Sequence, residues 1–206
     1  MTTAREIRII ELPDIEKCLE FSMQNTFSTH PRAQLKCEVG GLDVLRTLKK
    51  KELLLHVVNQ TTQERIFTGL IENASVKEEA LQYYVLTLTL VGVSKLMDVD
   101  SKSKSFQNVL SQYADIIKKV SNVYSQVTLD VSIENDSQIG RPLIQYKETD
   151  WEFIKRVASR KQEPVFVDET QSIGYVYVGS KQERDRGNEL TETTYSEGMD
   201  GRFYSW

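Results

Sequence analysis

The sequence contains few of the residues from which metal sites and disulfide frameworks are built. Its two cysteines, Cys18 and Cys37, form no C-x-x-C pair, and its two histidines, His30 and His56, belong to no H-E-x-x-H motif. Zinc sites depend on such spacings, so we expect no metal and no cofactor. Two cysteines are also too few for a disulfide framework. They are interpreted as buried free thiols, with a single disulfide as the alternative.

Motifs for nucleotide binding and for nucleophilic catalysis are missing as well. The sequence has neither G-x-G-x-x-G nor G-x-x-x-x-G-K-[ST], the loops that hold nucleotide phosphates. It also lacks the G-x-S-x-G elbow of many hydrolases, although the residue counts leave a Ser-His-Asp triad open. No catalytic or cofactor-binding residue is therefore assigned, and we expect the protein not to be an enzyme.

Long apolar runs and a strong charge of one sign are also absent. The apolar stretch at residues 53–58 is far shorter than the ~20 residues of a membrane-spanning helix. Residues 1–11 hold no apolar core of a secretory signal, so we expect a soluble chain made in the cytosol without membrane insertion of its own. The net charge of −4 gives no basic surface, and we expect no nucleic-acid partner.

Residues 1–100 are predicted to consist mainly of β-strands. The strongest candidate is residues 83–93, in which Leu86, Leu88 and Leu90 share one face by the period of two. The other expected elements are strands at 18–23, 33–39, 52–58 and 65–75, polar connectors at 59–64 and 76–80, and a short helix within 42–50. Short strands at this spacing favour a small barrel or sandwich.

Residues 101–206 are predicted to mix helices with strands. After a polar linker at 97–104, an amphipathic helix is expected at about 105–122, capped by Ser105. Its predicted apolar face consists of Phe106, Val109, Leu110, Tyr113, Ile116, Ile117 and Val120. A second helix is expected at 149–161, because T-D-W-E at its start fits a capping box and Trp151 begins a buried stripe.

Further strands are expected at residues 127–133, 143–146, 165–167 and 173–178. The predicted fold class is therefore α+β and β-rich, with two barrel-like domains at 1–100 and 101–206. For the second domain, a closed barrel and an open sheet with helices both stay open. The chain ends in polar residues from Ser180 and in the aromatic segment 203–206, which we interpret as docked or as cut from a longer product.

Two groups of carboxylates could carry chemistry. Glu148 and Asp150 could form an acid–base pair, but acidic residues at a helix start also satisfy its free N–H groups and dipole, which is the interpretation we favour. Asp130, Glu134 and Asp136 could supply oxygen ligands for calcium. Because they lack the glycine and the terminal glutamate of an EF-hand, we assign no metal site.

The remaining charged residues have structural interpretations. Asp98, Lys102 and Lys104 either form salt contacts between neighbouring subunits or belong to a solvated linker. Arg156 is predicted to pair with Glu152, one helical turn earlier. The lysine run at 49–51 is interpreted as a solvated edge rather than a phosphate site.

Two segments resemble a known family. Residues 143–158, L-I-Q-Y-K-E-T-D-W-E-F-I-K-R-V-A, resemble the Q-Y-x-E-T-D-x-x-F-I-x-R-L-A motif of phage late control gene D proteins and of the VgrG spike proteins of type VI secretion. Residues 92–108, G-V-S-K-L-M-D-V-D-S-K-S-K-S-F-Q-N, are similar to the family's S-x-L-M-D-x-x-x-x-S-x-S-F-Q junction. Together with the β-rich first part, the resemblance covers most of positions 10–180.

The resemblance implies the central hub of a contractile injection machine: a phage tail, a tailocin or a related system. Members of the family form homotrimers whose paired barrel-like domains create a pseudo-sixfold ring between a hexameric tail tube and a trimeric spike. The implied partners are further copies of the chain, the tube protein, a spike or needle protein and other baseplate proteins. The implied location is a particle assembled after synthesis in the bacterial cytoplasm. The family's longer members continue into a C-terminal spike region, which another chain or a longer product would supply.

Two other functions remain as alternatives. A hydrolase could act on cell-wall glycan through Glu148 or Glu152 with a distant aspartate, since glycosidases use two carboxylates across a cleft. A monomeric adaptor could use the hub fold without forming a ring. The structural hub is the function that we expect.

Overall fold

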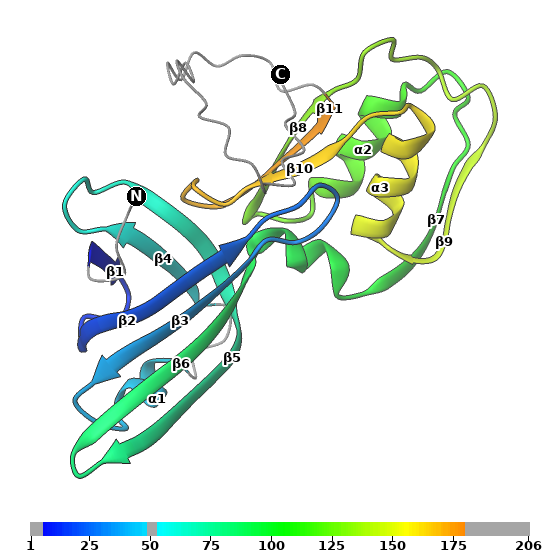
Figure 1. The fold of residues 1–206 in the computed structure, drawn as a ribbon. Coiled ribbons are helices and arrows are strands. Elements are labelled where there is room, and N and C mark those ends of the chain that lie inside the picture. Colours follow the sequence, from blue (N-terminus) through cyan, green and yellow to red (C-terminus); the bar gives the residue numbers. More distant parts are fainter. Residues whose placement is uncertain (1–5, 49–52, 180–206) are drawn as a thin grey trace, which may run out of the picture.

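The computed structural model describes residues 6–48 and 53–179 (Figure 1). The first part of the chain forms a six-stranded sheet in which every neighbouring pair is antiparallel. In chain order its strands are β1 (Ile7–Ile9), β2 (Ile15–Gln24), β3 (Arg32–Val39), β4 (Leu54–Asn59), β5 (Arg65–Ala80) and β6 (Tyr83–Gly92). Their spatial order is β1-β4-β5-β6-β3-β2. The edge strands β1 and β2 lie near each other, so the sheet is a nearly closed barrel.

The interior of this barrel follows from the alternation along its strands. Leu86, Leu88 and Leu90 of β6 are fully buried, which confirms the predicted apolar face. On β3, Leu35 lies opposite Leu88 in the register and is also fully buried. The short helix α1 (Val44–Leu48) lies within the predicted range and buries Val44 against this core.

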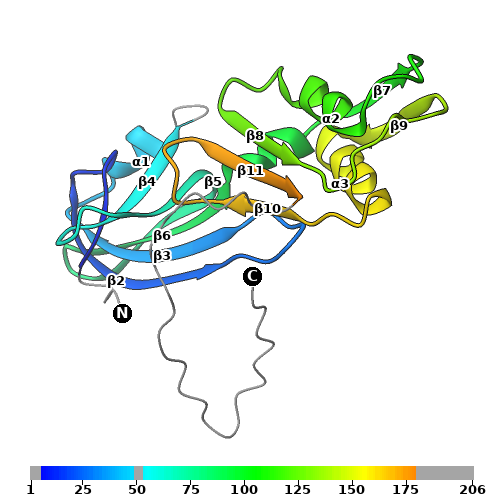
Figure 2. The ribbon, with the colours of Figure 1, turned by 90° about the horizontal axis from the view of Figure 1, so that it is seen from above.

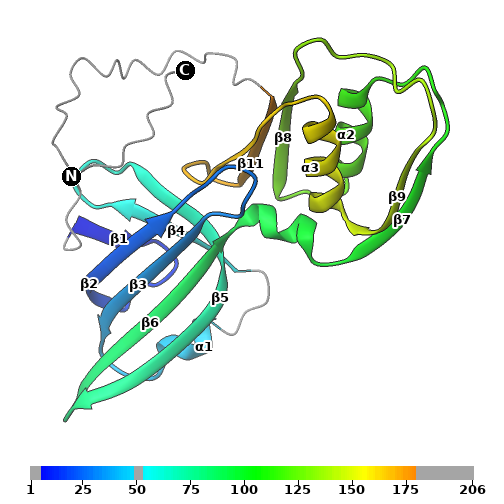
Figure 3. The same ribbon diagram turned by 45° about the vertical axis from the view of Figure 1, so that its right-hand side comes forward.

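One predicted connector is wrong. Residues 76–80 are not a loop but the last part of β5, which runs to Ala80 and pairs with β6 through Val76↔Leu86 and Glu78↔Tyr84. The sequence K-E-E-A has no apolar alternation, because in this outer part of the hairpin neither face is fully buried. The hairpin therefore extends as a long arm beyond the other strands (Figures 1 and 3).

The second part of the chain is an open sheet covered by helices. Its three strands are β8 (Val127–Ser132), β10 (Val165–Asp168) and β11 (Gly174–Gly179), in the order β10-β11-β8 with β11 and β8 parallel. The helices α2 (Tyr113–Ser121) and α3 (Asp150–Arg160) lie between this sheet and a two-stranded ribbon of β7 (Ser101–Phe106) and β9 (Leu143–Thr149) (Figure 3). Of the two architectures left open for this part, the described residues form the open sheet, and the predicted α+β, strand-rich class is confirmed.

The predicted helix at 105–122 begins eight residues too early. The segment S-K-S-K-S-F forms β7, in which Lys102, Lys104 and Phe106 are half-buried and the serines between them are exposed. This alternation has the period of a strand, and pairing with β9 stabilises it. The helix begins at Tyr113, after Gln112, whose side chain makes no cap hydrogen bond.

The residues between β7 and α2 account for the rest of this error. The Asn108 side chain accepts a hydrogen bond from the backbone N–H of Leu110 at 3.2 Å, which forms a turn where a helix was predicted. Val109 and Leu110 are therefore exposed rather than packed on the helix face. The later residues of that face, Ile116, Ile117 and Val120, are buried as predicted.

The second predicted helix is confirmed as α3, with its capping box. The Thr149 hydroxyl accepts a hydrogen bond from the backbone N–H of Glu152 at 3.1 Å, and the Glu152 carboxylate accepts one from the backbone N–H of Thr149 at 2.9 Å. Trp151 is 2% exposed and belongs to the core between the helices and the sheet, as predicted.

Two hydrophobic cores lie in the described residues, one inside the barrel and one between the helices and the open sheet. They are joined through the 3-10 helix η2 (Val93–Asp98) and through the β10–β11 hairpin, which lies between the barrel and the helices (Figure 2). Two contacts of this hairpin with the barrel are the Thr68 hydroxyl to the Gln171 carbonyl at 2.6 Å and the Ser28 amide to the Val165 carbonyl at 2.8 Å. The division into domains at residue 100 stays a prediction.

Among the described residues, no helix has the length and apolar character needed to cross a membrane. The predictions for the lysine run at 49–51 and for residues 180–206, including the aromatic segment 203–206, lie outside the described residues.

Candidate functional site

A hydrogen-bonded network joins the barrel to the second part of the chain. His30, in the loop between β2 and β3, contacts the Ser94 hydroxyl through Nδ1 at 2.8 Å and the Asp98 carboxylate through Nε2 at 3.2 Å. Asp98 also accepts hydrogen bonds from Lys95 Nζ at 2.9 Å and from the Thr149 hydroxyl at 2.7 Å. We call these five residues the Asp98 network. It connects η2, the β2–β3 loop and the start of α3.

The electrostatics of the Asp98 network favour a neutral histidine beside an ionised carboxylate. Burial, together with the charges of Lys95 and Lys155, lowers the pKa of His30 against the opposing effect of Asp98. Burial raises the pKa of Asp98, but hydrogen bonds from Lys95, Thr149 and His30 outweigh it and hold the pKa at about 2. A neutral His30 then donates a hydrogen bond from Nε2–H to the Asp98 carboxylate and accepts a hydrogen bond from the Ser94 hydroxyl at Nδ1.

Ser94, His30 and Asp98 thus have the residue types of the catalytic triad that the sequence left open. Ser94 is fully buried, so its hydroxyl has no access to a substrate. A shallow pocket of about 180 Å³ lies beside His30, lined otherwise by Gln24, Thr26, Thr29 and Arg32, and Ser94 is not part of it. The ring of Trp151 covers His30, with centroids 4.5 Å apart. The arrangement therefore positions segments of the chain instead of presenting a nucleophile.

A second network surrounds Asp150, which is fully buried at the start of α3. Its carboxylate accepts hydrogen bonds from Lys102 Nζ at 2.5 Å, Lys104 Nζ at 3.2 Å, the Tyr124 hydroxyl at 2.7 Å and Gln145 Nε2 at 2.8 Å. Burial raises the pKa of Asp150, but the hydrogen bonds and the lysine charges outweigh it, so the pKa is lowered. This Asp150 cluster attaches the β7–β9 ribbon to α3.

The structure gives new roles to the charges of the predicted linker. Asp98 belongs to the Asp98 network, and Lys102 and Lys104 neutralise Asp150 within the same chain. The linker interpretation of Lys102 and Lys104 is wrong, because both residues lie in a strand. The alternation S-K-S-K was the one sequence signal for this arrangement, since it turns both lysines toward the same side.

The carboxylates of the hydrolase hypothesis hold structural positions. Glu148 pairs with the Arg156 guanidinium through two hydrogen bonds, one of them from Nε at 3.0 Å. The predicted pair of Arg156 with Glu152 is therefore wrong, because Glu152 is used by the capping box. Asp150 is paired with lysines and is not an acid–base partner of Glu148.

The other candidate residues also hold structural positions. Cys18 and Cys37 face each other across β2 and β3 as buried free thiols. His56 binds Glu11 at 2.5 Å and the Ser172 carbonyl at 3.0 Å. In residues 6–48 and 53–179, no three His, Cys, Asp or Glu side chains, including the carboxylates at 130, 134 and 136, gather as a metal site.

A second hollow of the described surface lies at the far end of the barrel. It has a volume of about 420 Å³ and is lined by Asp14, Glu16, Val39, Gly40, Gly41, Asp43 and Val44. The described residues that line it include no cation, histidine or cysteine to work with its carboxylates.

Comparison with known proteins decides the family. Residues 32–178 match the family described as "Phage tail baseplate hub (GPD)". The chain belongs to the phage tail baseplate hub family. The match begins at β3 and ends in β11, so it includes the strands β3 to β6 of the barrel, the Asp150 cluster and the core between the helices and the open sheet. This membership confirms the family resemblance inferred from residues 92–108 and 143–158.

Solved structures have the same fold as this hub-family chain. One of them is the E. coli c3393 protein, a component of the type VI secretion system that is described as similar to T4 bacteriophage tail proteins gp27 and gp5. Its TM-score is 0.63 at 16% sequence identity, and the alignment covers 85% of this chain and 49% of the c3393 chain. The prophage MuSo2 43 kDa tail protein from Shewanella oneidensis has a TM-score of 0.60 at 15% identity, over 87% of this chain and 55% of its own. A tail protein from Neisseria meningitidis MC58 has a TM-score of 0.60 at 15% sequence identity, and the alignment covers 84% of this chain and 49% of that protein.

The chain spans about half the length of these solved proteins. No curated protein has a matching sequence. At these identities the likeness concerns the fold, and the family membership rests on the match over residues 32–178.

Proposed function

We propose that the chain is a structural subunit of a baseplate hub, in which three copies close a pseudo-sixfold ring that connects the tail tube to the spike. The observation that carries this proposal is the family match over residues 32–178, which includes four of the six barrel strands, β3 to β6, and the β7–β9 ribbon. Closed oligomers of one chain need self-complementary surfaces rather than a catalytic cleft. The proposed partners are further copies of the chain, the tube protein, a spike or needle protein and other baseplate proteins.

We propose further that the chain acts without enzymatic activity. Ser94 is buried, and the carboxylates of Glu148, Asp150 and Glu152 are bound to cations or to a helix start. A glycosidase needs two carboxylates facing a cleft, which these residues do not provide. The proposed setting is a phage-tail-like particle assembled after synthesis in the bacterial cytoplasm, with 1–100 and 101–206 as the two hub domains.

Absolute mass in solution tests the proposal. Light scattering on a size-exclusion column, over a range of concentrations, should give the mass of three 23.7 kDa chains, and electron microscopy should then show rings. A monomer at all concentrations that also fails to bind a candidate tube or spike protein would refute the hub. A monomer that forms a three-copy complex when one of them is added would support the hub, and a monomer that binds it as a single copy would support the monomeric adaptor.

A turbidity assay on cell walls tests the hydrolase alternative. The hub proposal predicts no lysis by the wild-type protein. Lysis that is lost in both Glu148→Gln and Glu152→Gln would overturn the structural assignment, because it would show that one of these carboxylates acts on a substrate.

A further inference from the structure

The β7–β9 ribbon presents apolar side chains to solvent. Its inner face carries Leu143 and Gln145, which are buried, whereas Ile144 and Tyr146 on the outer face are 57% and 66% exposed. Leu110, in the turn that follows β7, is 65% exposed. In the part of the chain that the structure describes, the ribbon has no third strand, so both of its edges can accept a partner.

The same face is basic. Lys147 is exposed and lies over the Tyr146 ring, with Nζ 5.4 Å from the centroid. Arg141 is exposed just before β9. Within residues 6–48 and 53–179, no carboxylate forms a salt bridge with either cation. Apolar groups flanked by unpaired cations are typical of a protein-binding surface that recognises an acidic segment.

The tip of the β5–β6 hairpin has the opposite character. Leu81 at its turn is 92% exposed, and Glu79 and Glu78 lie two and three residues before it in the last part of β5. Lys77 pairs with Glu79 at 3.0 Å, so the tip keeps an excess of negative charge at Glu78. An exposed leucine beside carboxylates complements the exposed isoleucine and tyrosine beside cations on the ribbon.

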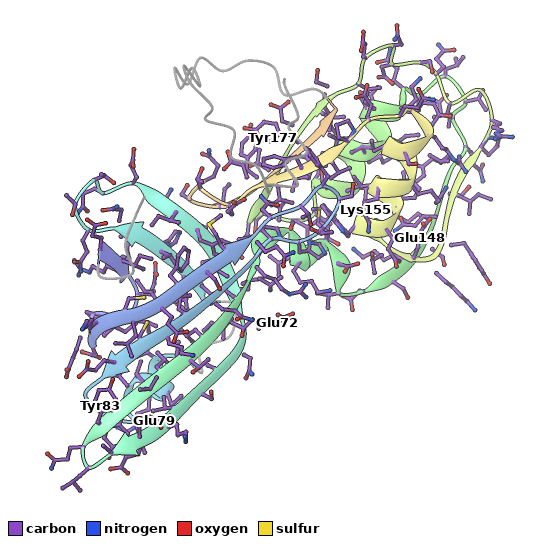
Figure 4. The ribbon with its side chains drawn as sticks, viewed as in Figure 1. Glu72, Glu79, Tyr83, Glu148, Lys155 and Tyr177 are labelled. Atoms are coloured by element: carbon purple, nitrogen blue, oxygen red, sulfur yellow. The ribbon has the colours of Figure 1, made fainter. Side chains whose placement is uncertain are left out.

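The hairpin tip and the ribbon lie at opposite ends of the molecule. Figure 4 shows Glu79 and Tyr83 at the hairpin end, and Glu148 and Lys155 at the end that carries β9 and α3. The two surfaces of one chain therefore cannot meet each other. A contact between them joins two copies head to tail, and such contacts generate a ring when the rotation closes.

We propose that the β5–β6 hairpin of one copy docks on the β7–β9 ribbon of the next copy, with Leu81 against Ile144 and Tyr146 and with Glu78 facing Lys147. The inference rests on the proposed ring, for which it supplies the contact between copies. The occupant of the ribbon is a second copy, because the chain itself carries the complementary tip.

Charge reversal tests the contact. Glu78→Lys with Glu79→Lys should weaken association about tenfold or more, because like charges facing across an interface are strongly unfavourable. Arg141→Glu with Lys147→Glu should do the same, and the chain with all four changes should recover association. Glu134→Lys and Lys119→Glu, both at exposed positions, are the controls and should leave the mass unchanged. Unchanged association of both reversed chains would overturn the interface.

Cross-linking tests the pairing directly. A chain with both Leu81→Cys and Ile144→Cys should form disulfide-linked dimers and trimers that neither single variant forms, since Cys18 and Cys37 are buried. A wild-type trimer that is insensitive to reversal and gives no such ladder overturns the interface and leaves the hub in place. Disulfide-linked species that continue beyond the trimer to higher oligomers would support the contact and refute the closed trimeric ring. If instead a tube or spike protein binds this ribbon in a mixture with the chain, and no second copy binds there, the proposal that a second copy occupies the ribbon is also overturned.

Discussion

Replacing Asp150 by asparagine should destabilise the protein far more than the loss of a surface charge. Asp150 is fully buried and accepts hydrogen bonds from two lysines, a tyrosine and a glutamine. Asparagine keeps the shape of the side chain but removes its charge, so Lys102 and Lys104 would face each other without a counterion. Breaking a buried ion pair in this way costs about 3–5 kcal/mol.

The structure places the expected cost at the lower end of that range. The side chains of Lys102 and Lys104 are 28% and 35% exposed, so both can turn partly into water when the carboxylate is lost. We therefore expect a loss of about 3 kcal/mol in the free energy of unfolding. For a chain of this size, that corresponds to a fall in melting temperature of roughly 6–12 °C.

Urea unfolding monitored by circular dichroism measures this change. The matched control is Glu72→Gln, which breaks the exposed pair with Arg32, whose side chains are 38% and 53% exposed, and should cost less than about 1 kcal/mol. In the background of Asp150→Asn, Lys104→Met should recover part of the loss, because it removes one of the unpaired charges. If Asp150→Asn and Glu72→Gln differ by less than about 0.5 kcal/mol, the reasoning about the Asp150 cluster is refuted.

Three further predictions concern the Asp98 network. Because folding lowers the pKa of Asp98 to about 2, its stabilisation is fully present above pH 4 and lost as the pH falls toward 2, by roughly 2 kcal/mol. His30 also has a lowered pKa in the folded protein, so the free energy of unfolding should begin to fall below pH 6.5. Urea midpoints measured between pH 7 and 5 should show this fall in the wild-type protein, and His30→Gln should remove it. Thr149→Ala removes both the helix cap and the bond to Asp98 and should cost about 1–2 kcal/mol in thermal unfolding, whereas Thr149→Ser, which keeps both bonds, should cost less than half of that. Equal losses in the two Thr149 variants would contradict the role of the hydroxyl.

The sequence predicts the elements that depend on local or periodic signals. β6 has alternating leucines, and α3 has a capping box and an apolar stripe, so their positions could be inferred without a structure. The start of α2 could not, because residues 105–112 also satisfy helical spacing. The period-two pattern of S-K-S-K-S-F indicates a strand, but only the pairing of β7 (residues 101–106) with β9 (residues 143–149) shows that this segment is a strand and not the start of the helix.

The Asp98 network and the Asp150 cluster were beyond local inference for a related reason. His30 meets Asp98 and Asp150 meets Lys102 only because the chain folds back on itself, and neither spacing is a motif. The sequence predicts Asp150 at the positive end of the helix dipole, and the structure adds the two lysines that neutralise it. Arg156 lost its predicted partner because Glu152 belongs to the capping box. Its guanidinium binds Glu148 at the end of β9 instead.

These networks have a consequence for the proposed contact between copies. The ribbon that would receive the hairpin is held on α3 by the Asp150 cluster, and α3 is held to the barrel by Thr149, Asp98 and His30. The barrel carries the hairpin, so hydrogen bonds and ion pairs fix the orientation of one docking surface relative to the other. In a head-to-tail ring this orientation determines whether the rotation closes, because a small change in angle is repeated at every contact. In the proposed ring, the polar groups at this junction would therefore serve the geometry of assembly as well as the stability of the single chain.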